Sequence, residues 1–173
     1  MNEELGEIKA SYGVWFRRRS KFPPSRVWRA ISNADEVSRW MTYPARIDLR
    51  PGGEYFVDFS RTDEGALDGI ISHLEPGRRL LFVWGTSTVE WVLEPDGTGT
   101  KYLFAHHGQY PRPIADEEGL AAGWHSWLDD LDYVIEHGTA SPDAQRHDRW
   151  LALKPSYRSS IESVISLDVP ARS

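Results

Sequence analysis

Apolar and polar side chains alternate along most of the chain between residues 44 and 107. The alternation resumes after the turn signal Pro51-Gly52-Gly53, and three further turn signals divide the segment. Successive side chains of a β-strand point to opposite faces of the sheet, so this period of two predicts strands with one buried face. The predicted strands span residues 45–49, 55–59, 67–74, 79–84, 88–94 and 100–107.

Short turns join these strands, which predicts an antiparallel meander. The clearest turn is Pro95-Asp96-Gly97-Thr98-Gly99, because Asp-Gly supplies the positive φ angles that a tight hairpin requires. A further strand over residues 11–20 precedes the meander, with Tyr12, Val14 and Phe16 on one face.

Two short helices are predicted after this first strand. Phe22-Pro23-Pro24 ends the strand, and proline suits the first turn of a helix. Apolar residues then recur at helical spacing over Val27–Ile31. The sequence Ser32-Asn33-Ala34-Asp35 is typical of a helix cap and predicts a second helix that ends near Trp40 and Met41.

A long amphipathic helix is predicted from the acidic residues 116–118 to about residue 137. At about 100° per residue, one set of apolar side chains falls within an arc about 120° wide. This set comprises Leu120, Trp124, Trp127, Leu128, Leu131, Val134 and Ile135. The separate polar flank consists of His125, Asp129, Asp132 and Glu136. We expect the apolar face to be buried and the polar flank to be exposed to solvent.

The remaining segment, residues 138–173, is more polar. Ser141-Pro142-Asp143 is typical of a helix N-terminus, and we expect a short helix that Pro155 ends, followed by a weak helix around Ile161–Ile165. The apolar stretch Trp150–Leu153 is unfavourable as a patch in water. We therefore expect it to dock on the body of the protein, to cover the mouth of a pocket or to join a homodimer.

The composition excludes several classes of protein. The 173-residue chain has the size of one domain, and its 40% hydrophobic and 27% charged residues are typical of a globular protein. It has no cysteine, which excludes disulfides and thiol chemistry. Its net charge of −6 argues against a nucleic-acid or membrane partner. The acidic N-terminus is unlike a signal peptide, so we expect a cytoplasmic location.

The order of the elements predicts an α+β fold. A curved antiparallel β-sheet wraps around the long C-terminal helix, with two short helices after the first strand, because the inner face of the sheet needs an apolar cover. We expect an N-terminal extension at residues 1–9, the domain at residues 10–137 and a tail at residues 138–173.

Several motifs along residues 10–137 carry a resemblance to a known family. They are Phe22-Pro23-Pro24, Val27-Trp28-Arg29-Ala30, Trp40, Pro51-Gly52-Gly53, Gly69, Pro76, Leu80, Trp84, Gly123-Trp124, Leu128 and Leu131. In order and spacing they resemble the START-like (SRPBCC) superfamily, which has the helix-grip fold. Within it, the chain is similar to the activator of heat-shock-protein-90 ATPase homologue family.

This resemblance implies a cavity between helix and sheet, which the superfamily uses for lipids, sterols, polyketides and other hydrophobic ligands. Our leading hypothesis is a protein that binds a small hydrophobic molecule without catalytic residues, cofactor or metal, since no catalytic motif is recognisable. A second hypothesis is a regulator of a heat-shock chaperone ATPase in the stress response. A third is an aromatase- or cyclase-like enzyme. The fold alone does not choose among them.

Eight tryptophans make aromatic side chains the candidates for pocket walls. The predicted ligand-binding residues are Trp40, Phe56, Trp84, Trp91, Phe104, His106 and Trp124. The alternative is that these rings form only the hydrophobic core. His106 shares strand parity with Phe104, so we expect it to face inward and His107 outward. There it would orient a ligand, transfer a proton with Asp58 or Tyr102, or simply be a hydrogen-bonded strand histidine.

Two further charged groups have simpler interpretations. His125 and Asp129 have the i, i+4 spacing of a metal-binding pair, but no third neutral ligand is evident, so we expect a solvated helix face. The basic cluster of Arg17-Arg18-Arg19 with Lys21 is interpreted as a solvated strand end rather than a phosphate site.

Overall fold

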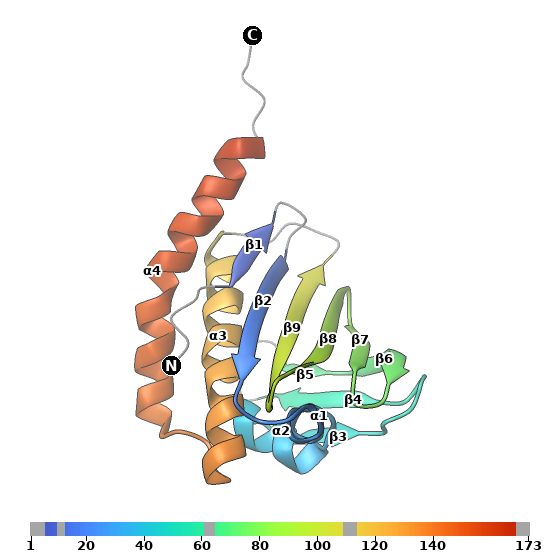
Figure 1. The fold of residues 1–173 in the computed structure, drawn as a ribbon. Coiled ribbons are helices and arrows are strands. Elements are labelled where there is room, and N and C mark those ends of the chain that lie inside the picture. Colours follow the sequence, from blue (N-terminus) through green and yellow to red (C-terminus); the bar gives the residue numbers. More distant parts are fainter. Residues whose placement is uncertain (1–5, 10–12, 61–64, 109–113, 169–173) are drawn as a thin grey trace.

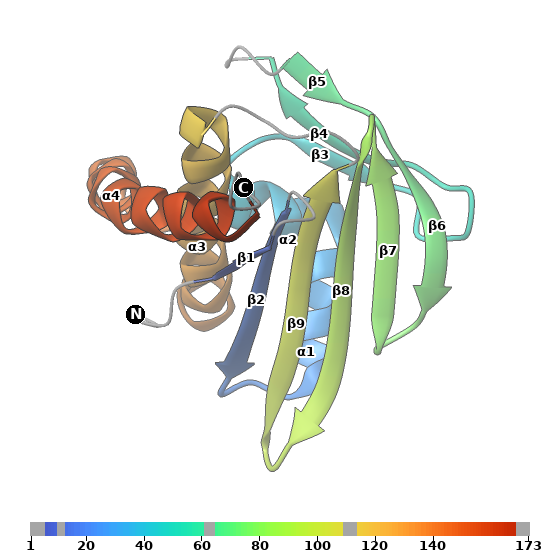
Figure 2. The ribbon, with the colours of Figure 1, turned by 90° about the horizontal axis from the view of Figure 1, so that it is seen from above.

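Two antiparallel sheets form the framework of the protein in a computed structural model, which describes residues 6–9, 13–60, 65–108 and 114–168 (Figure 1). Within these ranges, the larger sheet has six strands in the order β1-β2-β9-β8-β7-β6. Its strands are β1 (Glu7–Lys9), β2 (Gly13–Ser20), β6 (Gly69–Glu75), β7 (Arg79–Trp84), β8 (Ser87–Asp96) and β9 (Gly99–Gly108). The smaller sheet contains β3 (Ala45–Ile47), β4 (Tyr55–Phe59) and β5 (Gly65–Leu67). Figure 2 shows the curvature of the larger sheet.

The predicted meander is confirmed from β6 to β9. In the hairpin between β8 and β9, Asp96 pairs with Gly99, so Gly97 and Thr98 form a two-residue turn. Gly97 has a φ of +62°, a conformation that side chains with a Cβ atom rarely adopt. The strand β2 then pairs with β9, so a strand near the N-terminus lies beside the last strand of the meander.

The predicted strand over residues 67–74 is divided in the structure. Its first residue belongs to β5, which pairs with β4, whereas β6 begins at Gly69 and pairs with β7. A Cβ atom on Gly69 would lie 2.5 Å from the Tyr55 carbonyl oxygen and 2.6 Å from the Trp84 ring. Glycine is therefore required here, because the two sheets approach each other closely at this point.

Both short helices are confirmed. Helix α1 (Pro24–Ser32) has a proline in its first turn, and α2 (Ala34–Met41) follows directly. The side chain of Asn33 caps α2 by accepting a hydrogen bond from the Glu36 backbone N–H at 3.1 Å.

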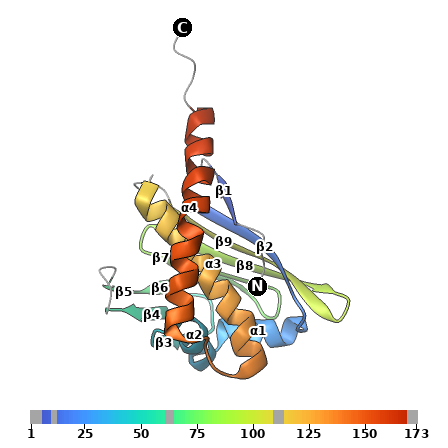
Figure 3. The ribbon, with the colours of Figure 1, turned by 90° about the vertical axis from the view of Figure 1, so that its left-hand side faces the viewer.

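The long helix α3 (Ile114–His137) covers the inner face of the sheet, as the helix-grip fold requires (Figures 2 and 3). All seven residues of the predicted apolar arc lie in or against the hydrophobic core. Four of them, Trp124, Leu128, Leu131 and Val134, are fully buried. The apolar face of α3 was thus predicted correctly from its period alone.

The tail forms one continuous helix, α4 (Asp143–Asp168), which packs along α3 (Figure 3). The expected end at Pro155 was wrong: proline removes one backbone hydrogen bond, but burial of Tyr157 and Ile161 beyond it favours continuation of the helix. Trp150 and Leu153 dock against the core as expected, whereas Leu151 is 48% exposed. No helix in the described part of the chain is long and apolar enough to cross a membrane.

Candidate functional site

Six of the seven predicted site residues gather between α3 and the inner face of the sheet. They are Trp40, Trp84, Trp91, Phe104, His106 and Trp124, and the most exposed of them, His106, is only 6% exposed. They come from α2, from the consecutive strands β7, β8 and β9, and from α3. The fold therefore assembles the predicted aromatic wall (defined here as these six residues).

The rings of the aromatic wall contact one another in an unbroken series. Ring centroids are 6.2 Å apart for Trp40–Trp91, 4.8 Å for Trp91–Phe104 and 4.2 Å for Phe104–Trp124. Trp84 continues the series at 6.3 Å from Trp124. Most of these pairs are edge-to-face or tilted, which are the favourable arrangements of aromatic quadrupoles.

Two of the tryptophans are held in place by backbone carbonyl groups. Trp40 donates from Nε1 to the Ala30 carbonyl oxygen, and Trp84 donates to that of Tyr55, both at 2.9 Å. Because a buried indole N–H without a partner is unfavourable, these bonds fix the orientation of each ring. Both rings are thus rigid parts of the wall.

His106 faces inward, as its parity with Phe104 predicted. Trp124 donates from Nε1 to His106 Nδ1 at 2.8 Å. A ring nitrogen that accepts a hydrogen bond carries no proton, so the neutral imidazole has its proton on Nε2. Protonation of Nδ1 would remove this acceptor, which makes the contact specific for the neutral ring.

Phe56 does not join the aromatic wall. It lies on the other face of β4, where the Arg46 guanidinium covers its ring at 3.7 Å. Tyr55, Val57 and Phe59 supply the core face of this strand. Alternation along β4 therefore excludes Phe56 from the inner face.

Several aromatic residues near the wall were missed, among them Phe59, Trp127 and Tyr43. Phe59 lies 6.0 Å from Trp84, and Trp127 lies 5.2 Å from Trp124. Both had a sequence signal, since Phe59 shares the core parity of β4 and Trp127 belongs to the apolar arc of α3. Tyr43, 4.7 Å from Phe59, had none, because it follows the irregular C-terminus of α2.

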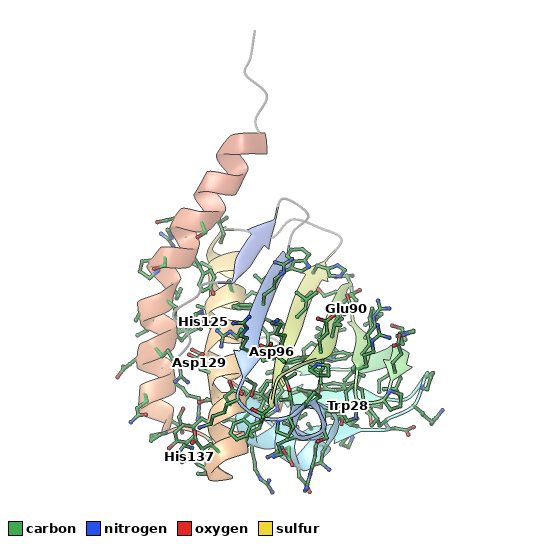
Figure 4. The ribbon with its side chains drawn as sticks, viewed as in Figure 1. Trp28, Glu90, Asp96, His125, Asp129 and His137 are labelled. Carbon is green, nitrogen blue, oxygen red and sulfur yellow. The ribbon has the colours of Figure 1, made fainter. Side chains whose placement is uncertain are left out.

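The expected solvent exposure of the α3 polar flank was wrong for most of its length. The Asp129 side chain is only 6% exposed and accepts a hydrogen bond from Arg18 Nη1 at 2.6 Å. His125 is 3% exposed, and Figure 4 shows both residues between α3 and β2. Asp132 accepts from Ser20 Oγ at 2.6 Å. Only the last residue of the flank, Glu136, is exposed, where it pairs with Lys21.

Arg18 also departs from the interpretation of its basic cluster as a solvated strand end. Alternation along β2 exposes Arg17 and Arg19 but turns Arg18 inward, where it is 5% exposed. Asp129 balances the charge of Arg18. Burial raises the pKa of the neighbouring Asp132 carboxyl, whereas the hydrogen bond that Asp132 accepts from Ser20 and the charge of Arg18 oppose this shift.

Helix α4 completes this buried polar network. Arg149 contacts Asp130 at 3.0 Å and Asp129 at 3.8 Å. The Tyr157 hydroxyl lies 2.9 Å from His125 Nδ1 and accepts a hydrogen bond from the Gly6 backbone N–H at 2.8 Å. The outer side of α3 is thus covered by charged and polar groups of α4, which explains how its polar flank is buried.

His125 and Asp129 belong to the structural polar network between α3, β2 and α4. Their closest atoms are 3.9 Å apart, and Asp129 also pairs with two arginines. Among the residues that the structure describes, no group of three or more His, Cys, Asp or Glu side chains is placed to hold a metal ion.

An acid-sensitive contact joins α3 and α4 at the other end of the network. Glu118 accepts hydrogen bonds from Arg158 Nε at 2.6 Å and Nη2 at 3.0 Å, and these bonds lower its pKa below the ordinary value of 4.5. A lowered pKa stabilises the folded state above pH 4.5, and this stabilisation is lost as the pH falls through the folded-state value. Because Arg158 is half exposed, we expect an effect of about 1 kcal/mol.

We therefore expect Glu118→Gln to lower the free energy of unfolding at pH 6 to 7, and we expect this difference to disappear as the pH falls through the lowered pKa of Glu118. Urea unfolding of both proteins across this pH range measures the difference. Glu94→Gln, at an exposed position of β8, serves as the control and is expected to show no comparable pH-dependent difference. A constant difference between wild type and Glu118→Gln at all pH values would contradict the ionic origin of this contact.

Comparison with known proteins identifies the family. A model of the family described as Activator of Hsp90 ATPase homolog 1-like protein matches residues 21–136. The chain belongs to this family. The match runs from the end of β2 to the end of α3, and therefore includes the whole aromatic wall, whereas α4 lies outside the matched residues.

Solved structures share the fold of this chain. CalU16 from Micromonospora echinospora is 24% identical, with a TM-score of 0.66 and 88% of each chain covered. EF2215 from Enterococcus faecalis, a conserved protein of unknown function, is 17% identical, with a TM-score of 0.71, and covers 94% of this chain and 92% of its own.

A third structure, DynU16, is described as a protein in the dynemicin biosynthetic locus. It is 26% identical, with a TM-score of 0.64, and the match covers 74% of this chain and 48% of DynU16. The comparison with curated proteins gives no match.

Proposed function

We propose that the protein binds a small, predominantly aromatic or apolar molecule between α3 and the inner face of the sheet. The observation that carries this proposal is the buried hydrogen bond from Trp124 to His106 within the aromatic wall. Large rings supply contact area, and a few placed polar groups orient a ligand. The wall combines both features.

The rings of the aromatic wall contact one another, so a ligand between α3 and the sheet requires some of them to separate. Trp84 and Trp40 are anchored to the backbone, whereas Trp124 is anchored only to a side chain. Trp124 is therefore the ring that we expect to move, with His106 gaining the ligand as a new polar partner.

Two of the comparisons support a small-molecule ligand. The helix-grip fold places the covering helix against a concave sheet, and DynU16 belongs to a biosynthetic locus. DynU16 contributes through its description alone, whereas the helix-grip fold includes all the residues that the family model matches.

Native mass spectrometry of the untagged protein tests the proposal. We expect an additional mass that disappears on denaturation, and we expect the corresponding ligand to change Trp fluorescence and raise the melting temperature. A free ligand at 100 times its Kd stabilises by about 2.7 kcal/mol. A clean protein mass, together with unchanged fluorescence and melting temperature across a panel of aromatic and apolar compounds, would exclude ligand binding.

A second candidate is regulation of a heat-shock chaperone ATPase, which the description of the matched family favours. The test is the ATPase rate of the host's own chaperone with and without this protein. An unchanged rate over a wide concentration range would remove this candidate.

A further inference from the structure

Arg18 and Tyr102 form a second polar feature of the same interior. They are direct partners across β2 and β9 and are only 5% and 3% exposed. Both face α3, because Arg18 contacts Asp129 and because Tyr102 shares strand parity with Phe104 and His106. The Tyr102 ring lies 5.7 Å from Trp91, so the pair is continuous with the aromatic wall.

Three donor groups of this pair have no acceptor outside the pair within the described part of the chain. Asp129 accepts from Nη1 of Arg18, whereas Nε, Nη2 and the Tyr102 hydroxyl have no partner beyond a contact of the Arg18 side chain with the Tyr102 oxygen. Nε and Nη2 form one edge of the planar guanidinium, with two nearly parallel N–H bonds. Buried donors without an acceptor are unfavourable, and native proteins normally supply one.

The charges around these donors select the kind of acceptor. Burial raises the pKa of the Tyr102 hydroxyl far above neutrality, and the charges of Asp132 and Asp129 add to this shift. The charge of Arg18 and a hydrogen bond from its side chain oppose it. The hydroxyl is therefore a donor at neutral pH. Because Asp129 already matches the Arg18 charge and Asp132 lies nearby, a second carboxylate would meet repulsion.

We propose that Arg18 and Tyr102 are a subsite for a neutral carbonyl oxygen of the ligand. This inference rests on the proposed function and deepens it: the ligand is an aromatic ketone, quinone or related carbonyl compound rather than a plain hydrocarbon or an acid. Its rings lie against the aromatic wall, and its carbonyl oxygen accepts from the guanidinium edge and the phenol.

Three related probes separate these ligand classes: fluorene, 9-fluorenone and fluorene-9-carboxylate. They share a tricyclic frame and differ at one carbon atom, so titration of Trp fluorescence and calorimetry compare the polar group directly. We expect 9-fluorenone to bind about tenfold more tightly than fluorene, as one well-placed bond to a charged donor provides. The carboxylate is expected to bind no better than fluorene.

Tyr102→Phe is the decisive variant. It should reduce the preference for 9-fluorenone over fluorene at least threefold while fluorene binding stays unchanged. The melting temperature of the unliganded variant should stay close to that of wild type, because the hydroxyl proton that is removed has no acceptor in the described part of the chain. Arg18→Lys, which keeps the charge opposite Asp129 but lacks the guanidinium edge, should reduce the same preference.

Tyr55→Phe is the matched control, since Tyr55 is equally buried but its hydroxyl donates to the Ile31 carbonyl oxygen at 2.9 Å. It should lower the melting temperature by about 2–4 °C and keep the preference for 9-fluorenone.

The outcomes distinguish the two proposals. Equal binding of fluorene and 9-fluorenone, tighter binding of the carboxylate, or an unchanged preference in Tyr102→Phe would overturn the carbonyl subsite and leave the ligand-binding proposal standing. A melting temperature of unliganded Tyr102→Phe lowered as much as that of Tyr55→Phe would also overturn it, because the hydroxyl proton would then have an acceptor without ligand. Absence of binding by all three probes would count against the proposed function itself.

Discussion

Replacing Asp130 with alanine is expected to lower the free energy of unfolding by about 3–5 kcal/mol. Asp130 on α3 is completely buried. Burial raises the pKa of its carboxyl, and its hydrogen bond from Ser141 and the charges of Arg149 and Arg146 oppose this shift. Asp130 pairs with Arg149 at 3.0 Å and Arg146 at 3.5 Å, and it accepts a hydrogen bond from Ser141. The substitution leaves two largely buried arginines of α4 without their main partner, which is more costly than the loss of an exposed ion pair.

The chain contains a matched control for this substitution. Asp143 also pairs with Arg146, but its side chain is 95% exposed. Asp143→Ala should therefore change the free energy of unfolding by less than about 1 kcal/mol. Urea unfolding monitored by circular dichroism measures both values. Similar small losses for the two variants would show that the network does not hold α4 on the body of the protein.

Replacing Trp124 with alanine is expected to lower the free energy of unfolding by about 3–5 kcal/mol. Its ring is 2% exposed and contacts Phe104, Trp84 and Trp127. Truncation removes these contacts, leaves a cavity beneath α3 and deprives His106 of its donor. Trp124→Phe keeps much of the ring volume and should lose less, about 1–3 kcal/mol.

Trp15 provides the control for this position. It lies on the outer face of β2, where it stacks on His107 at 5.8 Å and is only half-buried. Trp15→Ala should be clearly less destabilising than Trp124→Ala in the same urea unfolding experiment. If Trp124→Ala were as mild, the helix–sheet interface would not depend on the aromatic wall.

The Trp124 variants also bear on the proposed function. If Trp124 is the ring that moves on binding, Trp124→Phe should still bind fluorene, since a smaller ring leaves more room between α3 and the sheet. A complete loss of fluorene binding in a folded Trp124→Phe protein would show instead that the indole is itself the main contact surface.

Periodic patterns were sufficient for most of the fold. The bounds of β7 were predicted to the residue, and all seven residues of the predicted apolar arc of α3 meet the core, although the arc omitted Ala121 and Ala122. Parity along β9 also placed His106 on the inner face. These features are local, because a strand or helix exposes a fixed set of side chains to whatever it packs against.

The errors on the α3 polar flank and on the end of the tail helix have a common physical origin. The polar flank of α3 has the sequence pattern of a solvent-exposed surface. In the structure, α4 packs against it and supplies arginines that pair with its carboxylates. Pro155 reads as a helix end, but burial of Tyr157 beyond it keeps the helix intact. In each case a segment distant in sequence provides the compensating contact, and no local pattern reports that contact.

The sequence by itself determined the strand and helix periods, and with them the inward faces, the helix-grip layers and six members of the aromatic wall. Only the tertiary structure decided which charges are buried, that Trp124 donates to His106, and that Arg18 and Tyr102 meet between β2 and β9. The reason is that the period of an element depends on its own backbone geometry, whereas the burial of a charge depends on whether another segment supplies an opposite charge or a hydrogen bond.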